Sequence, residues 1–323
     1  MKLNNKIVLI TGGTGSFGKK FTEIVLEKYK LKKLIIFSRD EQKQYEMERE
    51  FNNKTIRYFI GDVRDKERLY RAFSNVDIVI HAAALKHVHL GEYNPFEVVK
   101  TNILGAQNII NVAIDQGVKK VIAISTDKAT NPINLYGATK LCSDKLFIAG
   151  NSYAGKAKTI FSVVRYGNVI NSTGSVIPLF EKLKKTGTIP ITDKNMTRFW
   201  ITLEQGVDFV LKCLGLMKGG EILVPKLPSM SIMDLAKAIA PECKYEFTGI
   251  RPGEKIHEVL IPKDEARNTL EFPDYFLIKP SFTMFGKRNY GNEKGKLIDH
   301  SFEYRSDNND WRVTPQELLN MIK

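Results

Sequence analysis

The sequence is poor in cysteine, and no two cysteines stand close enough to suggest a shared metal ion. Its 323 residues include three, and these lie far apart at Cys142, Cys213 and Cys243. Such spacing is not typical of a disulfide-stapled secreted domain or of a structural zinc site. We therefore expect a protein of a reducing compartment, stabilised by a hydrophobic core and without a structural metal.

Long hydrophobic runs are also missing. The first apolar run, Ile7–Ile10, follows basic residues but stops at a threonine and two glycines. A signal peptide needs an apolar stretch of about 7–15 residues, and a membrane helix needs about 20. We find no internal repeat and no low-complexity segment. The expectation is a soluble, cytoplasmic protein with no membrane partner.

Acidic residues are fewer than basic ones, at 36 against 49, which gives a net charge of +13. The lysines are dispersed along the chain, so the excess does not predict a nucleic-acid site. It would still attract a substrate that carries a diphosphate. We therefore expect no nucleic-acid partner.

A glycine-rich turn stands near the start of the chain. A strand expected at 6–11 runs into a helix expected from about residue 15. Glycines in this strand–turn–helix setting let the backbone approach a dinucleotide pyrophosphate at the helix N-terminus. The cofactor candidates in this turn are Gly12, Thr14, Gly15, Ser16, Phe17 and Gly18.

The end of the second expected strand, 33–38, indicates which dinucleotide binds. Folds that prefer NAD commonly carry a carboxylate at this strand end, whereas this chain has Ser38 and Arg39 before Asp40. A guanidinium can hold a 2′-phosphate through charge-assisted hydrogen bonds. We therefore predict NADP as the cofactor, with Ser38, Arg39 and Lys43 as its contacts at this end.

Strands and helices alternate along the first half of the chain. Further strands are expected at 57–60, 76–81, 120–125 and 159–165, and helices at 41–51 and 95–116. This order predicts an α/β fold with a doubly wound parallel (Rossmann) sheet, whose ligands bind at the carboxyl ends of the strands. Three more cofactor candidates lie at such ends: Asp62, Val63 and Ala82.

The next motif follows the strand at 120–125. Thr126, Asp127 and Lys128 end that strand, and Tyr136 and Lys140 open a helical pattern with both side chains on one face. A lysine beside a phenol lowers the tyrosine pKa, and a shift from ~10 to about 7 needs roughly 4 kcal/mol. Such pairs are common on ordinary helices, but here the strand end and the glycine turn favour a catalytic base.

Polar residues after the strand at 76–81 suggest further contacts. Lys86 is a candidate for the substrate, and Asn102 for bracing the active-site backbone. His81, His87 and His89 lie close together, but their spacing fits no familiar metal motif. We predict no metal here.

The second half of the chain predicts a smaller α/β lobe for the substrate. We expect the cofactor domain at 1–169, rejoined by about 201–225, and the substrate lobe with a C-terminal tail at 170–200 and 226–323. Arg198 and Arg251 are candidates for a diphosphate, because guanidinium groups bind phosphate in forks.

Five stretches resemble one enzyme family: 11–18, 81–87, 125–140, 196–202 and 251–255. They are similar to the inverting UDP-N-acetylglucosamine 4,6-dehydratases, of the extended short-chain dehydrogenase/reductase superfamily. The similarity runs from the first strand through at least Pro262. The resemblance implies UDP-N-acetylglucosamine as substrate, the first step of pseudaminic acid synthesis for flagellin or another surface glycan, and a homo-oligomer, either dimer or hexamer.

The resemblance also implies roles for single residues. Retaining relatives carry a glutamate where this chain has Lys128, so an amine at this position fits inversion at C5. Tyr136 would deprotonate O4, Lys128 would remove the C5 proton, and Asp127 would protonate the departing C6 hydroxyl. Thr126 and Lys140 complete the catalytic set, and Asn168 and Glu254 join the substrate contacts.

These roles require a raised pKa at Asp127 and a lowered pKa at Lys128, the latter through burial and repulsion from Lys140. The acid and base roles of Asp127 and Lys128 can also be exchanged. Three other functions stay open: a retaining dehydratase, a 4-epimerase, and a non-catalytic NADP-binding regulator.

Overall fold

The computed structural model describes residues 3–155, 157–170, 172, 174–282, 289–290 and 294–322. The strands are β1 (Ile7–Thr11), β2 (Lys33–Ser38), β3 (Ile56–Ile60), β4 (Ile78–His81), β5 (Lys120–Thr126), β6 (Ile160–Tyr166), β7 (Asn168–Val169), β8 (Thr188–Ile191), β9 (Thr197–Ile201), β10 (Ile222–Pro225), β11 (Ser229–Ser231), β12 (Lys244–Phe247), β13 (Val259–Ile261), β14 (Thr269–Glu271), β15 (Tyr275–Ile278), β16 (Lys296–Leu297) and β17 (Tyr304–Arg305).

The helices are α1 (Ser16–Lys28), α2 (Glu41–Phe51), α3 (Lys66–Ala72), α4 (Val88–Tyr93), α5 (Pro95–Val99), α6 (Gly105–Asp115), α7 (Leu135–Tyr153), α8 (Val176–Leu183), α9 (Leu203–Leu216), α10 (Ile232–Ile239), α11 (Lys263–Ala266) and α12 (Pro315–Ile322). A π-helical turn, η1 (Lys100–Leu104), joins α5 to α6. Two 3-10 turns, η2 (Asp127–Ala129) and η3 (Lys184–Thr186), follow β5 and α8.

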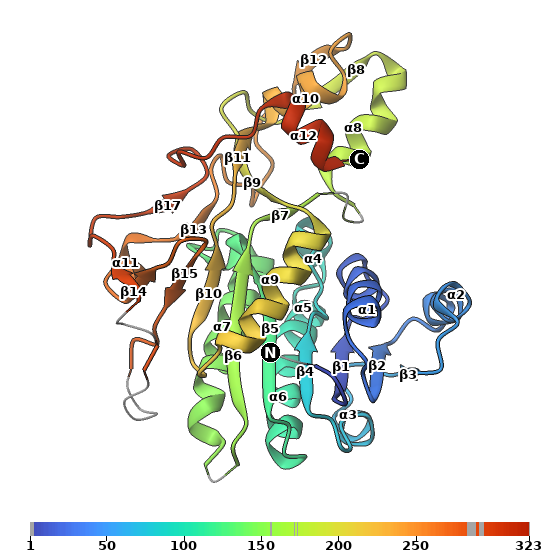
Figure 1. Cartoon of the computed structure of the whole chain (residues 1–323). Helices are drawn as coiled ribbons and strands as arrows, with labels where there is room; N and C mark the ends of the chain where they lie inside the picture. The colour runs from blue at the N-terminus through green and yellow to red at the C-terminus, as the bar shows by residue number, and fades with distance from the viewer. Residues whose placement is uncertain are drawn as a thin grey trace.

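The central sheet confirms the expected doubly wound parallel fold. Its strands lie in the order β16-β14-β15-β10-β6-β5-β4-β1-β2-β3. From β10 to β3 every neighbouring pair is parallel. The strands are almost wholly apolar because helices cover both faces: α1 and α9 lie on one side, and α6 and α7 on the other (Figure 1). The order β3-β2-β1-β4-β5-β6 is that of dinucleotide-binding sheets.

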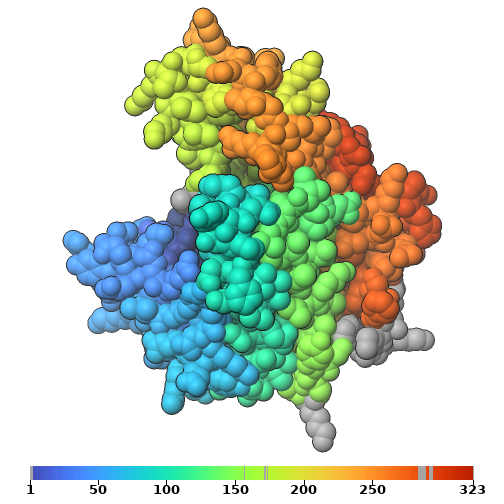
Figure 2. Space-filling model, turned by 180° about the vertical axis from the view of Figure 1, so that it is seen from behind, coloured from blue at the N-terminus to red at the C-terminus, as the bar shows by residue number. Residues whose placement is uncertain are grey.

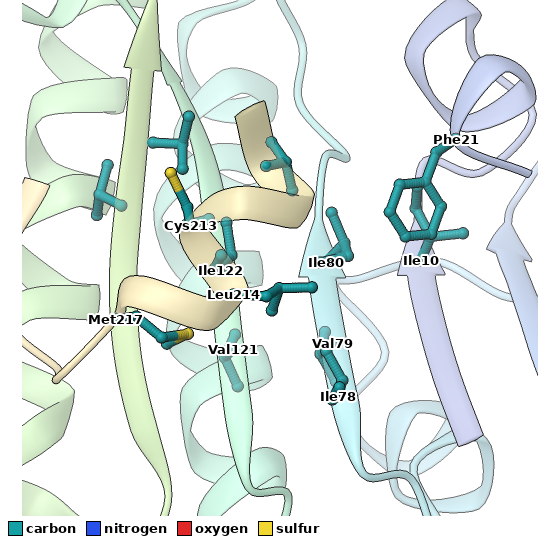
Figure 3. Close-up of a cluster of buried hydrophobic side chains, with 14 of the residues drawn as sticks. Ile10, Phe21, Ile78, Val79, Ile80, Val121, Ile122, Cys213, Leu214 and Met217 are labelled. Atoms are coloured by element: carbon teal, nitrogen blue, oxygen red, sulfur yellow. The ribbon is translucent and has the colours of Figure 1, made fainter. Parts of the chain in front are cut away.

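Helix α9 returns the chain to this sheet after residue 202. A capping box on Thr202 and Gln205 satisfies its first backbone N–H groups. Cys213 and Leu214 of α9, and Met217 directly after it, lie against the apolar side chains of β4 and β5 (Figure 3). Burial of this face holds the segment on the central sheet.

A second hydrophobic cluster lies beyond the carboxyl ends of the sheet. It includes Ile177, Phe180, Trp200, Leu235 and Leu318, from α8, β9, α10 and α12. These elements form the upper part of the molecule in Figure 1. From behind, a surface notch separates the yellow-green part of this lobe from the blue N-terminal segment (Figure 2).

Two expectations about the chain's organisation need correction. We expected all of 226–323 in the second lobe, yet β14 and β15 extend the central sheet, because β15 pairs antiparallel with β10. The expected single helix at 95–116 is also interrupted. Its middle widens into the π-turn η1, where Thr101 and Asn102 are buried.

Candidate active site

The polar residues that end the parallel strands meet along one edge of the sheet. Gly12 follows β1, Arg39 follows β2, Asp62 follows β3, Ala82 follows β4, and Asp127 follows β5. Since these strands are parallel and in register, their carboxyl ends point the same way. This edge is where an α/β sheet binds its ligand.

The glycine turn fits a dinucleotide pyrophosphate. Gly12 has a φ of +66°, and a Cβ on it would lie 2.9 Å from the backbone nitrogen of Ala83. Only glycine allows so close a contact between the first and fourth strand ends. Helix α1 has Gly15 at its N-cap, no capping side chain and no acidic residue in its first turn. Its N-terminal N–H groups therefore face the site without a side-chain acceptor from the cap.

The end of β2 presents a cation. The hydroxyls of Thr14 and Ser38 are 2.8 Å apart, and the Arg39 side chain is 58% exposed. The carboxylate of Asp40 is occupied elsewhere: it accepts from the backbone N–H of Lys43 at 3.0 Å and pairs with the Lys43 ammonium at 3.1 Å. These contacts lower the Asp40 pKa and keep it on the cap of α2.

Asp62, one of the cofactor candidates, is held by a neighbouring arginine. Its carboxylate accepts from Arg64 Nη2 at 2.7 Å and lies 3.8 Å from Arg39. Burial raises the pKa of Asp62, but its hydrogen bonds from Arg64 outweigh this and lower the pKa overall. Val63 follows it and is buried against the core.

Tyr136 and Lys140 lie on the first turns of α7, as the spacing predicted. Asn134 caps this helix by accepting from the backbone N–H of Gly137 at 2.7 Å. Lys140 does not point its ammonium at the phenol, because Nζ donates to the Ile124 carbonyl at 2.8 Å. Burial lowers the pKa of Lys140, although the charge of Asp144 opposes that change.

Lys140 alone does not lower the pKa of Tyr136 in this structure, and the share that we expect from an oxidised nicotinamide stays a prediction. Burial raises the pKa of Tyr136 to about 12. The Lys128 charge and a hydrogen bond with Thr126 act in the opposite direction, but they are weaker than burial. The cation that acts on this phenol is therefore Lys128. The Lys140 ammonium instead donates to the Ile124 carbonyl of β5.

Thr126, Asp127 and Lys128 form one hydrogen-bonded unit at the end of β5. The Thr126 hydroxyl donates to Asp127 Oδ1 at 2.9 Å, and Lys128 Nζ donates to the same oxygen at 3.0 Å. Asp127 is wholly buried, and its Oδ2 has no hydrogen-bond partner among the described residues. A free carboxylate oxygen beside an amine is suited to acid–base chemistry on a bound substrate.

The charge state of Lys128 also differs from the prediction. Burial lowers its pKa, but the attraction of Asp127 and then of Glu258 outweighs burial and raises the pKa well above the ordinary value. Repulsion from Lys140, which we expected to keep the amine neutral, is not among the causes. Lys128 is therefore an ammonium within an ion pair.

Gly137 allows this unit to lie against α7. A Cβ at Gly137 would come 2.1 Å from the Lys128 carbonyl oxygen and 3.1 Å from Pro132 Cβ. We expect Gly137→Ala to push η2 away from the helix, to destabilise the fold by about 1–3 kcal/mol and to lower activity. Thermal unfolding and turnover measure the two effects.

Gly206→Ala is the matched control for this prediction. Gly206 also lies in a helix, α9, but the nearest atom to its added Cβ is 3.9 Å away. This variant should be neutral or slightly stabilising, by about 0.5–1 kcal/mol. Equal losses in both variants would show that helix context, and not the Lys128 carbonyl, is responsible.

Asn102 braces the backbone beside the site, as predicted. Its Oδ1 accepts from the Leu85 N–H at 2.8 Å, and its Nδ2 donates to the Leu85 carbonyl at 2.9 Å. The π-turn aims this side chain inward, and Nδ2 also contacts the Thr139 hydroxyl at 3.0 Å. The segment after β4, which includes Lys86, is thereby held near Lys128.

The segment 251–258 adds Glu258 and Lys255, to which the sequence analysis gave no role. Glu258 Oε1 lies 3.3 Å from Lys128 Nζ, and Lys255 Nζ donates to the Thr130 carbonyl at 2.5 Å. The sequence offered one signal for Glu258, since it is the only carboxylate within the apolar run 256–261. Asn134 donates to the Gly253 carbonyl at 2.8 Å, which fastens this segment to the start of α7.

The predicted substrate residues differ in their exposure and in the contacts that they make. Asn168 accepts weakly from Lys128 at 3.4 Å, and burial followed by repulsion from Lys128 lowers the pKa of Lys86. Arg251 is exposed, 3.8 Å from Glu254.

Arg198, in contrast, is buried and donates to the carbonyls of residues 197, 255 and 256. Its role as a diphosphate ligand is not supported, because these contacts use its guanidinium to shape the loop.

The histidine cluster has no metal-site geometry. His81 Nδ1 lies 2.8 Å from the Thr11 hydroxyl. Burial and repulsion from Lys140 lower its pKa to about 3, so it is a neutral core residue. Over the described ranges, no three His, Cys, Asp or Glu side chains gather as metal ligands do. In the same residues, no helix is long and apolar enough to cross a membrane.

Comparisons with known proteins agree with this geometry. Residues 8–280 match the family model described as polysaccharide biosynthesis protein. An inverting UDP-N-acetylglucosamine 4,6-dehydratase from Campylobacter jejuni is 56% identical over 99% of this chain and 98% of its own length. The chain belongs to this family. The resemblance to the inverting dehydratases seen in the sequence is thus confirmed.

Other proteins that this chain resembles bear different names. A UDP-glucose 4-epimerase from Rickettsia bellii is 41% identical over 98% of this chain and 95% of its own length. The X-ray structure of Pen from Bacillus thuringiensis has a TM-score of 0.91 and 42% identity, covering all of this chain and 98% of that one. This chain therefore shares its fold with Pen over its whole length.

Proposed function

We propose that this protein is an NADP-dependent UDP-N-acetylglucosamine 4,6-dehydratase that inverts C5. The observation that carries the proposal is the Asp127–Lys128 pair, in which a buried carboxylate and an amine meet at 3.0 Å at the end of β5. An elimination needs an acid and a base together, whereas a 4-epimerase does not. The identity to the Campylobacter jejuni dehydratase supports the same substrate.

The residues fit a nicotinamide dinucleotide along the edge from Arg39 to Lys140. When bound, this cofactor accepts a hydride from C4 of the sugar and later returns it to C6. Tyr136 removes the proton of the C4 hydroxyl during oxidation. Its hydrogen bond with Thr126 and the nearby Lys128 charge favour the phenolate and offset part of the burial effect.

One proton transfer within the Asp127–Lys128 ion pair gives the acid and the base that elimination needs. Moving the proton of Lys128 Nζ to Asp127 Oδ1 turns an ammonium and a carboxylate into an amine and a carboxylic acid. The amine then takes the C5 proton, which the 4-ketone acidifies, and the acid protonates the departing C6 hydroxyl as water. Both groups return to their starting charges, and reprotonation of C5 from the opposite face then inverts this centre.

The preference for NADP over NAD rests on Arg39, since Asp40 is held on the cap of α2. Arg39→Ala should lower the kcat/KM preference for NADP over NAD about tenfold or more, because a charge-assisted phosphate contact is lost. Cofactor titration of enzyme stripped of dinucleotide measures it. Arg49→Ala, at an exposed position of α2, should leave the preference unchanged; an equal effect there would contradict the assignment.

The wider setting is part of the same proposal. Arg251, Glu254, Lys86 and Asn168 would contact the sugar nucleotide, between a cofactor domain and a substrate lobe. The 4-keto-6-deoxy product would serve pseudaminic acid synthesis for flagellin, a capsule or an O-antigen, in the cytoplasm. We also propose a dimer or hexamer, which light scattering after size exclusion would test.

Proton NMR of the purified protein with UDP-N-acetylglucosamine in deuterated water tests the function. A 4-keto-6-deoxy sugar with deuterium at C5 and L-arabino couplings supports the proposal. D-xylo couplings would show a retaining dehydratase and overturn the role of Lys128. A 4-epimer would favour the activity named for the Rickettsia bellii relative. No turnover with NADP⁺ supplied would favour a non-catalytic role.

A further inference from the structure

Lys128 is surrounded by three acceptors from three separate segments. Its Nζ lies 3.0 Å from Asp127 Oδ1, 3.3 Å from Glu258 Oε1 and 3.4 Å from Asn168 Oδ1. An ammonium has three protons to donate, so these acceptors fix its direction. Asp127 and Asn168 follow the neighbouring strands β5 and β6, whereas Glu258 comes from a distant part of the chain just before β13.

Glu258 is held rigidly in this position. It is 2% exposed, its N–H donates to the Ser306 hydroxyl at 3.0 Å, and its carbonyl accepts from the Ser306 N–H at 2.9 Å. The Ser306 hydroxyl in turn lies 2.6 Å from the hydroxyl of Thr197 on β9. Burial of a charged carboxylate costs free energy, so Glu258 needs a nearby cation to compensate its charge.

Other cations nearby compensate it only partly. Arg198 Nε is 3.7 Å from Glu258 Oε1, but its terminal nitrogens donate to backbone carbonyls. Lys255 Nζ is 3.8 Å from Oε2, too far for a hydrogen bond, and donates to Thr130 instead. Glu258 Oε2 has no hydrogen-bond partner among the described residues. Lys128 is the cation nearest to this carboxylate.

We propose that Glu258 is a positioning residue for Lys128. From the segment 251–258, the Glu258 carboxylate keeps Lys128 in the ammonium form and directs it toward the substrate face. This inference rests on the proposed function only for the use of Lys128 as the C5 base. The contact also links the base to the loop that carries Arg251 and Glu254. A carboxylate outside the strand-end motif thus sets how readily the base loses its proton.

The direction of the pH effect follows from the charges that face Lys128. The carboxylates of Asp127, from η2, and Glu258 favour the ammonium, whereas Arg198 from β9, Lys255 beside Glu258, and Lys86 after β4 disfavour it. The Tyr136 phenol, from α7, is neutral below its raised pKa. Removing the Glu258 charge therefore lowers the pKa of Lys128, and the neutral amine appears at lower pH.

Glu258→Gln removes this charge and keeps the side-chain shape and a hydrogen-bond acceptor. Trace acetylation with acetic anhydride, read by peptide mass spectrometry, measures the reactive amine at Lys128 directly, with exposed Lys145 as an internal reference. At about pH 9 we expect labelling of Lys128 relative to Lys145 to rise about tenfold, since a pKa shift of one unit changes the amine fraction tenfold. Glu258→Asp, which keeps the charge, should restore low labelling.

The pH profile of deuterium exchange at C5 gives a second readout. In Glu258→Gln its acid limb should move about one pH unit lower, because less alkali is needed to form the amine. Glu303→Gln is the matched control: it removes a carboxylate from the same part of the chain, where Glu303 pairs with Arg305 at 3.4 Å. Neither readout should change there.

The two proposals fail in different ways. If labelling and exchange profiles of Glu258→Gln both superimpose on the wild type, Glu258 does not act on Lys128 and the inference is overturned. If the wild type shows no C5 exchange but labelling still rises in Glu258→Gln, the coupling stands and the dehydratase function is rejected. A uniform loss of activity in both Glu258→Gln and Glu258→Asp, with unchanged labelling, would show a structural role alone.

Discussion

Lys128→Ala is expected to abolish deuterium exchange at C5 and to lower turnover at least about 10³-fold, as the loss of a positioned general base does. No other amine donates a hydrogen bond to Asp127 within the described residues. The variant thus loses both the base and the proton that would make Asp127 an acid. The fold should survive, because Arg198 and Lys255 still lie within 3.8 Å of Glu258.

Oxidation at C4, the first half-reaction, should still take place in Lys128→Ala. Oxidation at C4 uses Tyr136, so reduced cofactor should still form, although more slowly, because the Lys128 charge lowers the Tyr136 pKa. NMR of the C5 position and the absorbance of the reduced cofactor separate the two steps. Lys119→Ala, at the opposite end of β5, is the control, since Lys119 is exposed and pairs with Asp77 at 2.8 Å. C5 exchange at the wild-type rate in Lys128→Ala would refute the base assignment.

The strand-end residues of the site could be placed from the sequence. Gly12, Arg39 and Asp127 each follow an apolar run, and parallel strands bring their carboxyl ends to one edge. Asn102 could be assigned a bracing role for the same reason, because it lies on the crossover after β4. Periodicity and order along the chain are sufficient for such inferences.

Electrostatics could not be read from spacing. The four-residue interval of Tyr136 and Lys140 places them on one helix face, but it does not say where a long side chain ends. The Ile124 carbonyl at the end of β5 captures the Lys140 ammonium at 2.8 Å. The pKa of Tyr136 then depends on burial and on the Lys128 charge, and the pKa of Lys128 depends on burial, Asp127 and Glu258, which only the folded chain brings together.

Arg198 and Glu258 show the same limit, because the roles of both residues depend on contacts within the folded chain. An arginine in a family-like motif suggests a phosphate ligand, yet its guanidinium donates to three carbonyls and shapes the loop at 255–256. Glu258 lies in an apolar stretch that reads as a strand, and its role depends on a contact with a distant part of the sequence. The residues that set the charge of the base are thus the ones that local pattern does not identify.

Tyr136→Phe should abolish oxidation at C4 and lower turnover by about 10³-fold or more, as the loss of a positioned general base does. Tyr166, a second phenol near Tyr136, does not offer a substitute base, because burial raises its pKa. The change deletes one oxygen and leaves the ring, so cofactor affinity should stay near that of the wild type.

The partial reactions identify what Tyr136→Phe has lost. Reduced cofactor should not form with UDP-N-acetylglucosamine, yet the same variant should exchange the C5 proton of the preformed 4-keto product, because Asp127 and Lys128 are intact. Tyr153→Phe, at the exposed end of the same helix, should behave as the wild type. Normal cofactor reduction in Tyr136→Phe would assign the base to another group, whereas loss of both partial reactions would mean that the phenol is needed to assemble the site and not only to move a proton.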